Sequence, residues 1–338
     1  MKKSALKFIS LVAAIAVAAV SLVACGSSNT TEDGKATKVT IGTLDLINGD
    51  LIAQYEKWYE KELGIDVNII KFDSGKDINS AIASGSIDIG QEGSSPAALA
   101  ISNDLDIQVF WIGDIIGSAE TLVAKNGSGI KKLSDLEGKK VGTPFASTAH
   151  YSLLNALKLE GVDVNKIELL DLQPDDIYAA WTRGDLDAAY VWHPVLGKLL
   201  ADGTAITDSE QLAKKGVVTA DTNIVRREFA EANPDVVSKF VELQLKANDI
   251  INNDSDKAAK EIASVLEIEE KDAAEQIQQF SYLTSDEEID YLDNSFAQTL
   301  KDTADFLVEQ KSIKSAPDLK TFQSKVTSEY VKKAAASK

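Results

Sequence analysis

The sequence predicts an α/β protein in which two α/β lobes are joined by a two-segment hinge, with extra C-terminal helices. Three observations lead to this prediction. The chain has 338 residues, 44% of them hydrophobic, which is enough for two domains with sizeable cores. Strand-like and helix-like runs alternate along the first part of the body, as in βα units that build open, mainly parallel sheets. The pattern at 71–100 is repeated at 170–197.

The first residues differ from the body and predict an export signal. Three lysines precede an apolar run at 8–24 that ends in LVAC, which is typical of a bacterial lipobox. We therefore expect 1–24 to be a lipoprotein signal peptide and Cys25 to carry the lipid; a plain transmembrane anchor is the alternative. The small, polar residues at 25–37 predict a flexible linker. The body would then be extracytoplasmic and lipid-anchored to the bacterial cell membrane.

Composition excludes several classes of function. The formal net charge of −18 argues against a nucleic-acid partner and against a polybasic membrane patch. Cys25 is the only cysteine, so no thiol remains for a disulfide or a nucleophile. The two histidines lie far apart and the carboxylates are scattered, so we expect no metal site and no cofactor.

The body opens with alternating elements. The β-rich runs lie at 38–45, 66–73, 107–113, 139–145 and 166–172. Helical spacing with a glycine at the exit occurs at 51–64 and 152–161. After residue 227 the pattern is helical only, and 234–251 carries an apolar stripe suited to a core. We expect these helices to pack on the first lobe.

The internal repeat predicts where the lobes divide. In each copy a glycine, Gly85 or Gly184, ends a helix, an aspartate follows three residues later, and a proline opens the next helix. The pattern would also be explained if it is simply common among βαβ units. The alternative that we develop is two lobes facing each other across a cleft. The first would comprise 38–125 plus 224–338 and the second 126–223, with crossings near 124–128 and 218–225.

Three loop-to-helix junctions are candidates for an anion site. They lie at 92–100, 145–154 and 190–197, and supply Ser94, Ser95, Ser147, Thr148, Trp192 and His193. Helix N-termini present unpaired N–H groups and a partial positive charge, and small hydroxyl groups add donors. Simple helix capping explains any single junction better than a ligand does, but the convergence of several junctions in a two-lobed protein favours a ligand. His150 could donate to an anion or serve packing.

Catalytic motifs are weak in this sequence. The stretch EGSSP lacks the second glycine of a nucleophile elbow, and neither a Walker loop nor a dinucleotide fingerprint occurs. A Ser–His–Asp triad depends on geometry rather than order, so an exported hydrolase using Ser94 or Ser147 stays an alternative. We expect a binding protein rather than an enzyme.

These motifs carry a family resemblance. The body resembles the taurine-binding proteins of ABC importers, within the wider sulfonate- and nitrate-type substrate-binding group. The matching stretches span most of 39–310 and include KFDSG, IASGSIDIGQEGSSPAALA, GKKVGTPFASTAHYSLLNALK and LLDLQPDDIYAAWTRGDLDAAYVWHPV. The resemblance implies a type II periplasmic-binding-protein fold, here expected as a monomer. Its lobes would close over a ligand and deliver it to a permease driven by an ATPase.

The resemblance also implies roles for individual residues. The ligand's sulfonate would bind the hydroxyl groups of the first two junctions, together with His150 or Tyr151; these hydroxyl groups belong to Ser94, Ser95, Ser147 and Thr148. Asp221 matches the acidic residue that binds the ligand's amine in the family. Trp192 would cover the alkyl stem, and Glu120 is a second candidate for the amine. Two positions, Asp45 and Asn223, depart from the family pattern, which extends the expected ligands from taurine to related aminoalkyl sulfonates.

Other functions remain open from sequence. The same fold could bind an alkanesulfonate, nitrate or a neutral vitamin precursor. A buried Asp221 would distinguish an amine-bearing ligand from these, because burying a carboxylate beside an anion that brings no cation costs free energy. An adhesive lipoprotein with a vestigial cleft is a further alternative.

Overall fold

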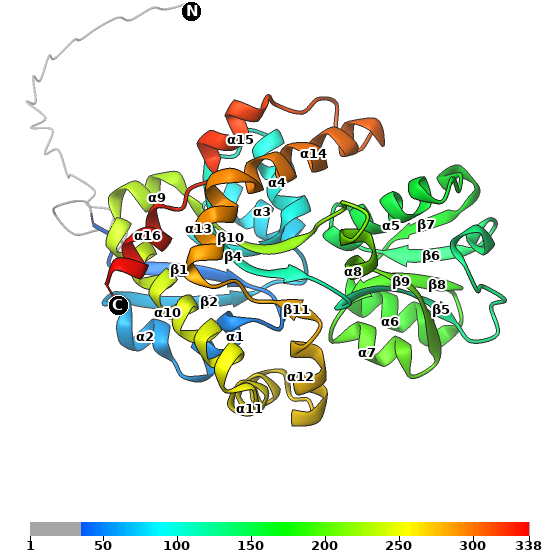
Figure 1. The fold of residues 1–338 in the computed structure, drawn as a ribbon, viewed down its shortest axis with the longest axis horizontal. Helices are drawn as coiled ribbons and strands as arrows, with labels where there is room; N and C mark the ends of the chain where they lie inside the picture. Colours follow the sequence, from blue (N-terminus) through cyan, green and yellow to red (C-terminus); the bar gives the residue numbers. More distant parts are fainter. Residues whose placement is uncertain (1–34, 338) are drawn as a thin grey trace, which may run out of the picture.

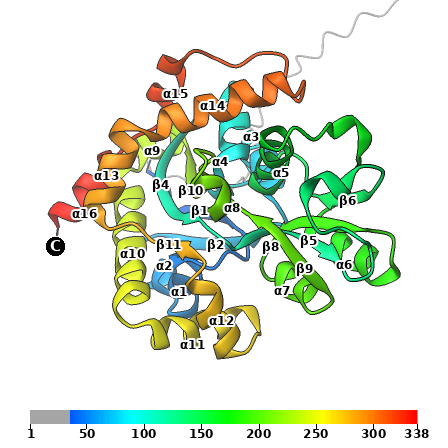
Figure 2. The same cartoon turned by 45° about the vertical axis from the view of Figure 1, so that its right-hand side comes forward.

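Two separate β-sheets organise the chain, and they lie side by side (Figure 1; Figure 2). The computed structural model describes residues 35–337. The six-stranded sheet has the order β11-β4-β10-β3-β1-β2, and the five-stranded sheet has the order β7-β6-β8-β5-β9. We call the elements around the six-stranded sheet the first lobe and those around the five-stranded sheet the second lobe.

The first lobe begins with alternating strands and helices. Their bounds are β1 (Lys38–Thr43), α1 (Gly49–Tyr55), α2 (Trp58–Glu62), β2 (Asp66–Lys71), α3 (Gly75–Ala83), β3 (Ile89–Gly93), α4 (Ser94–Ser102) and β4 (Ile107–Ile116). Strands β1, β2 and β3 are parallel, as the alternation predicts. The helix predicted at 51–64 is two helices, because Lys57 takes a left-handed conformation (φ 56°) between them.

The second lobe repeats this construction. Its elements are β5 (Glu120–Lys125), a 3₁₀ turn (Leu133–Leu136), β6 (Lys140–Thr143), α5 (Thr148–Leu159), a 3₁₀ turn (Val164–Lys166), β7 (Glu168–Asp171), α6 (Pro174–Arg183), β8 (Ala188–Trp192), α7 (Val195–Leu200), β9 (Gly203–Asp208) and α8 (Ser209–Ala213). Alternate residues of β5 and β8 enter two separate apolar clusters, so helices cover both faces of this sheet.

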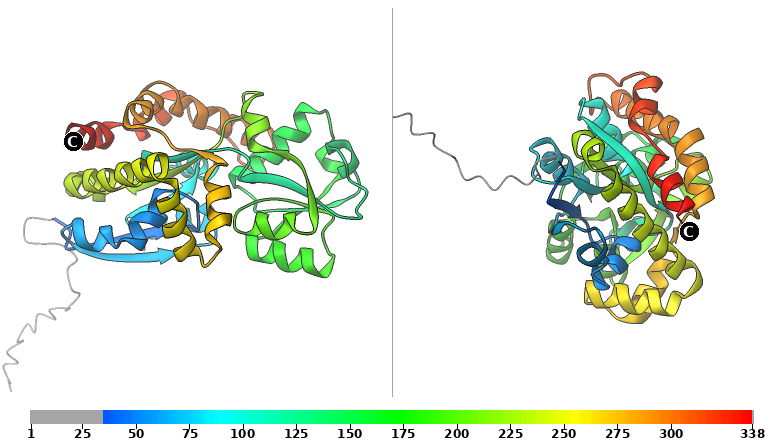
Figure 3. Two further views of the ribbon diagram at one scale, coloured as in Figure 1. Left: turned by 60° about the horizontal axis from the view of Figure 1, so that its bottom comes forward. Right: turned by 90° about the vertical axis from the view of Figure 1, so that its left-hand side faces the viewer.

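The chain then returns to the first lobe. It forms β10 (Ala220–Arg226), α9 (Arg227–Ala232), α10 (Pro234–Asn253), α11 (Ser255–Leu266), α12 (Glu270–Ile277), β11 (Phe280–Ser281), α13 (Ser285–Asn294), α14 (Phe296–Glu309), α15 (Leu319–Lys325) and α16 (Glu329–Ala336). The predicted packing of C-terminal helices on the first lobe is confirmed (Figure 3). The short β11 was not expected, and it pairs with β4 at the sheet edge.

The repeat seen in the sequence has a structural cause. The segments β2–α3–β3–α4 and β7–α6–β8–α7 occupy equivalent places in their sheets. In each copy the aspartate after the helix-ending glycine secures the neighbouring strand: Asp88 Oδ2 accepts from the Thr40 amide at 2.8 Å, and Asp187 Oδ2 accepts from the Lys140 amide at 2.9 Å. The shared spacing therefore reflects one construction used twice.

The crossings between the lobes differ from the predicted positions. Strand β5 pairs with β8 and β9, so it belongs to the second sheet, although the predicted boundary at residue 125 assigned it to the first lobe. The chain therefore crosses at 117–119, before β5, rather than at 124–128. Strand β10 pairs with β3 and β4, so the return crossing is complete before Ala220. A β-carbon at Gly117 would lie 2.4 Å from the Gln279 carbonyl oxygen, so the first crossing requires glycine.

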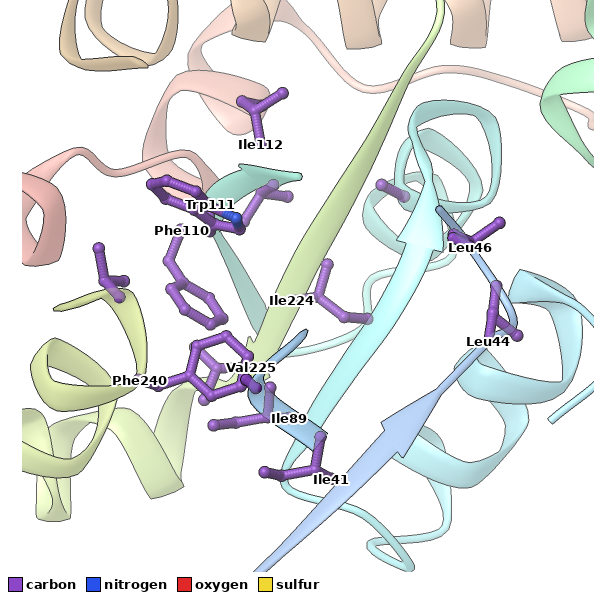
Figure 4. Packing of buried hydrophobic residues seen from close by; sticks show 14 of the residues in the cluster. Ile41, Leu44, Leu46, Ile89, Phe110, Trp111, Ile112, Ile224, Val225 and Phe240 are labelled. Atoms are coloured by element: carbon purple, nitrogen blue, oxygen red, sulfur yellow. The ribbon is translucent and has the colours of Figure 1, made fainter. Parts of the chain in front are cut away.

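The core of the first lobe lies between its sheet and the C-terminal helices. Phe110 of β4 packs edge-on against Phe240 of α10 with ring centroids 5.8 Å apart (Figure 4). The same core includes Leu44 and Leu46 in the loop after β1. The stripe predicted on 234–251 contributes Phe240, Leu243 and Ala247 to this core. The core thus fixes the strand ends that face the second lobe.

The predicted N-terminal features lie mostly outside the described residues. The signal peptide at 1–24 and Cys25 both fall there. The last residues of the predicted linker are held against the first lobe, because the Ala36 amide donates to Asn233 Oδ1 at 2.8 Å. Within residues 35–337, no helix combines the length and the apolar character needed to cross a membrane.

Candidate ligand-binding site

A small cavity lies between the lobes, where parallel strands of both sheets end. Open α/β sheets place ligands at this edge. The cavity measures about 20 Å³, which is room for one water molecule. Its lining is Leu44, Leu46, Gly75, Gly93, Pro96, Glu120, Ser147, Thr148, Trp192 and Asp221. Five of the predicted site residues therefore meet here: Glu120, Ser147, Thr148, Trp192 and Asp221.

The first lobe contributes the N-terminus of α4. Ser94 Oγ accepts a hydrogen bond from the Ala220 amide at 3.2 Å, so this hydroxyl ties β10 to the helix start. Ser95 is fully buried, and its hydroxyl has no hydrogen-bond partner among the described residues. A buried unpartnered hydroxyl at a helix N-terminus is a donor available to an anion.

The second lobe contributes the N-terminus of α5. Ser147 Oγ accepts from the His150 amide at 3.1 Å, which is an N-cap bond, and donates to the Pro144 carbonyl at 2.6 Å. The capping alternative therefore holds for Ser147, although this residue also lines the cavity. The Thr148 hydroxyl donates to Glu120 Oε1. A β-carbon at Gly93 would lie 2.7 Å from Thr148 Cγ2, so the absence of a side chain lets the two helix starts meet.

Three buried carboxyl groups converge beside these hydroxyls. Asp221 on β10 lies directly opposite Asp114 on β4 in an antiparallel pair, and Glu120 follows at the start of β5. Burial raises the pKa of Asp114 and of Asp221 above the ordinary range of an aspartate. Burial also raises the pKa of Glu120 to about 8, against the Thr148 hydrogen bond, which lowers it.

A polar network behind the cavity holds Asp114. Asn48 caps α1 and donates from Nδ2 to Asp114 Oδ2 at 3.2 Å. Gln91 Nε2 donates to Asn48 Oδ1 at 3.1 Å, and the Leu44 amide donates to Gln91 Oε1 at 3.0 Å. The network thus fixes the orientation of one Asp114 oxygen, while the other, Oδ1, has no partner among the described residues.

Four predicted anion ligands are absent from the cavity lining: Ser94, Ser95, His150 and Tyr151. The last two have other neighbours. His150 stacks on Phe145 with ring centroids 4.5 Å apart, and burial lowers its pKa to about 4, so the imidazole is neutral near pH 7. Tyr151 packs edge-on against Phe306 of α14 at 5.2 Å. Both follow Thr148 within one helical turn, and that turn directs them away from the cavity.

The residues that depart from the family pattern lie beside the cavity. Asp45 forms an ion pair with Lys71 at 2.5 Å and lines a neighbouring space of about 100 Å³ that also touches Trp192. Asn223 is buried within β10, two residues beyond Asp221. Neither residue is part of the cavity lining.

Sequence reasoning missed Asp114 and the glycine that lets the helix starts meet. The missed aspartate was detectable, because IQVFWIGDII carries one carboxylate in a strand whose only other polar side chain is Gln108. Such a residue costs free energy unless it has a partner or a function. Gly93 carries no signal of that kind, because its role depends on a contact from the other lobe. Within residues 35–337, no group of three or more His, Cys, Asp or Glu side chains is placed to hold a metal ion.

Comparison with known proteins places this arrangement in a family. The NMT1/THI5-like family model matches residues 47–258. The chain is 38% identical to the taurine-binding periplasmic protein of Escherichia coli (strain K12), over 88% of this chain and 93% of that protein. The chain belongs to the NMT1/THI5-like family. The resemblance inferred from the motifs is thereby confirmed.

Solved structures agree on the fold. The alkanesulfonate-binding protein SsuA of Xanthomonas axonopodis pv. citri, bound to MOPS, superimposes with a TM-score of 0.71 at 20% identity, covering 85% of this chain and 96% of that one. The desulfurization enzyme DSZB has the same fold, with a TM-score of 0.64 at 16% identity, covering 89% of this chain and 99% of that one. The predicted type II periplasmic-binding-protein fold is therefore confirmed, and this fold also occurs in an enzyme.

Proposed function

We propose that the protein is the extracytoplasmic substrate-binding protein of an ABC importer. It captures taurine or a closely related aminoalkyl sulfonate between its lobes and delivers it to a permease coupled to an ATPase. One observation carries the proposal: a cavity between the lobes is lined both by hydroxyls at helix N-termini and by a buried carboxyl group that faces another. Taurine carries a sulfonate at one end and an ammonium at the other, and each group suits one of these features.

The sulfonate end matches the two helix starts. The N-termini of α4 and α5 provide N–H groups and partial positive charge, and Ser147 and Thr148 line the space between them. The unpartnered Ser95 hydroxyl adds a donor, whereas Ser94 holds β10 in place. Charge-assisted hydrogen bonds of this type contribute about 1.5–3 kcal/mol each.

The ammonium end matches Asp221. Its carboxyl group is buried, and the cavity lining contains no Lys, Arg or His among the described residues. A ligand that brings its own cation relieves the cost of this buried acid. An alkanesulfonate, nitrate or a neutral vitamin precursor offers no such compensation, so the site favours an amine-bearing ligand over these alternatives. Trp192 lies beside the alkyl stem in this arrangement.

Capture requires movement of the lobes. A taurine molecule has several non-hydrogen atoms, more than a cavity of about 20 Å³ accommodates. The crossings before β5 and before β10 allow the lobes to part, and the ligand would enter before they close again. Closure would then bring the N-termini of α4 and α5 together around the ligand, with the lobes set wider apart than in this structure.

Binding without turnover fits the bonds at the candidate nucleophile. The Ser147 hydroxyl donates to a carbonyl, and Nδ1 of His150 accepts from the Ala146 amide at 3.3 Å. Among the described residues, no hydrogen bond joins a histidine ring to Ser94 or Ser147, as a triad would require. The proposal therefore assigns no catalytic residue. The proposal also includes removal of residues 1–24, attachment of a lipid to Cys25, and a monomeric state.

A thermal-shift and calorimetry series tests the proposal. The full chain, kept in detergent because of its apolar N-terminal run, is titrated with taurine, ethanesulfonate, ethylamine and nitrate. At 100 times its dissociation constant, taurine should stabilise the protein by about 2.7 kcal/mol. Ethanesulfonate and ethylamine each satisfy only one end of the site and should bind more weakly. Taurine that neither stabilises the protein nor releases heat on titration would refute the assignment, and turnover of a generic ester would favour the hydrolase.

A further inference from the structure

Asp114 and Asp221 are two buried carboxyl groups placed opposite each other. The two residues lie directly opposite each other on antiparallel strands β4 and β10, where side chains on the same face come within contact distance. Asp114 is fully buried and Asp221 is 4% exposed. Two ionised carboxylates in such a position repel each other strongly, and neither can donate a hydrogen bond. A hydrogen bond between them requires a proton on one of the two.

Among residues 35–337, no Lys, Arg or His side chain contributes to the electrostatics of the pair. The titratable groups that face it are Glu120 from β5 and Tyr282 after β11, and the Tyr282 hydroxyl donates to the Ile47 carbonyl at 2.6 Å. Asn48 from the start of α1 contributes a neutral amide donor to Asp114. Asp114 Oδ1 is buried and has no partner among the described residues. The Asp114 and Asp221 side chains lie within hydrogen-bonding reach of each other, so a cation bound at Asp221 can also reach the Asp114 carboxyl group.

We propose that Asp114 and Asp221 together form the ammonium subsite, that the ligand-free pair holds one shared proton, and that the ligand's ammonium displaces this proton into solvent. The inference rests on the proposed function, because it needs a ligand with a cationic group. No covalent bond changes: the proton leaves the O–H of one carboxyl group for the buffer, and ammonium N–H groups replace it as donors to both. Asp114 is thus a specificity-determining residue beside the acid that the resemblance indicated.

Coupling of this kind makes affinity depend on pH. Release of one proton strengthens binding by up to about tenfold per pH unit, over the range in which the ligand-free pair still holds its proton. Affinity should therefore rise with pH until the pair is already ionised or the ligand's amine loses its own proton. An alkanesulfonate leaves the shared proton in place and should show no such rise.

Calorimetry in buffers of different ionisation enthalpy counts the protons directly. The full chain in detergent is titrated with taurine near pH 7 in phosphate and in Tris, and the enthalpy difference gives the protons released per ligand. We expect a value near one for the wild type and near zero for Asp114→Asn, whose amide can donate to an ionised Asp221. Glu120→Gln should still release about one proton if the Asp114–Asp221 pair is the source.

A matched control separates this effect from general loss of a buried acid. Glu288→Gln removes another fully buried carboxyl group, one that accepts from the Ile112 amide and is absent from the cavity lining, and it should retain the wild-type proton count. If Asp114→Asn does not fold, the wild-type counts for taurine and for ethanesulfonate still decide the matter, because only the former should release a proton.

The outcomes distinguish two failures. Taurine binding without proton release, an unchanged count in Asp114→Asn, or loss of the release in Glu120→Gln alone overturns the inference and leaves the proposed function intact. Absence of binding by every sulfonate tested overturns both.

Discussion

Replacement of Gly93 by alanine tests whether the contact between the helix starts controls ligand binding. The backbone at Gly93 has φ −76° and ψ 163°, which alanine adopts without strain. Its new β-carbon would lie 2.7 Å from Thr148 Cγ2, whereas ordinary contact begins at 3.4 Å. Thr148 belongs to the other lobe, so the substitution should hold the lobes apart by about 0.7 Å at this point.

The expected loss is one of affinity rather than of folding. Overpacking of this kind costs about 1–3 kcal/mol, which corresponds to a dissociation constant weaker by about 5- to 150-fold. Taurine and any weaker sulfonate should lose affinity by similar factors, because closure does not depend on the ligand's amine. Isothermal titration calorimetry measures the affinities, and the melting temperature of the ligand-free protein should change little because the lobes can part.

Gly90→Ala is the matched control on the same strand. Its β-carbon would lie 2.6 Å from Ile78 Cγ2, inside the first lobe, so it should lower the melting temperature whether or not ligand is present. Wild-type affinity in Gly93→Ala would refute the closure argument. So would a ligand-free melting temperature reduced as far as in Gly90→Ala, because the clash would then lie within one lobe.

Further substitutions test the individual groups. Asp221→Asn should weaken taurine by about 10- to 150-fold while sparing ethanesulfonate in calorimetry, and equal losses would remove the amine role from Asp221. Ser147→Ala should lower the free energy of unfolding by about 1 kcal/mol, because it removes the α5 cap, and should weaken both ligands; unchanged affinities would leave Ser147 a cap only. Because the pKa of Glu120 is raised to about 8, whereas a glutamate in the unfolded chain titrates near ~4.3, ligand-free stability should fall as pH rises between these values. Melting curves of Glu120→Gln should show a smaller fall, and an equal fall would assign the effect to other buried acids.

Local pattern was sufficient to predict the fold class. The alternation of elements, the glycine stops and the repeated aspartate all reflect short-range chemistry, and the hydrogen bonds of Asp88 and Asp187 give the repeat its cause. The boundary at residue 125 was wrong because a strand's sheet depends on its partners. Nothing within ETLVAK indicates that β5 pairs with β8 and β9 rather than with β4.

The site was predicted in part for a related reason. Ser147, Thr148 and Trp192 belong to motifs at strand ends, where topology places ligands, whereas Asp221 was indicated by the family resemblance alone. His150 and Tyr151 belong to the same motif but follow the helix around to other neighbours, Phe145 and Phe306. The Tyr151–Phe306 contact depends on how α14 packs on α5, which the local pattern does not encode, and the His150–Phe145 contact depends on the conformation of the loop before α5.

The charge of the whole protein bears on the choice of ligand. A formal net charge of −18 produces a field that repels small free anions such as nitrate and sulfate. A zwitterion has no net charge, so the same field does not exclude it, and near the acidic pair its ammonium end is attracted first. The sulfonate then needs only the local N–H groups of α4 and α5, which act over a short distance after the ammonium has docked. The proposed preference for aminoalkyl sulfonates over simple anions therefore has two physical contributions: the overall charge repels free anions, and the buried acids attract the ligand's ammonium.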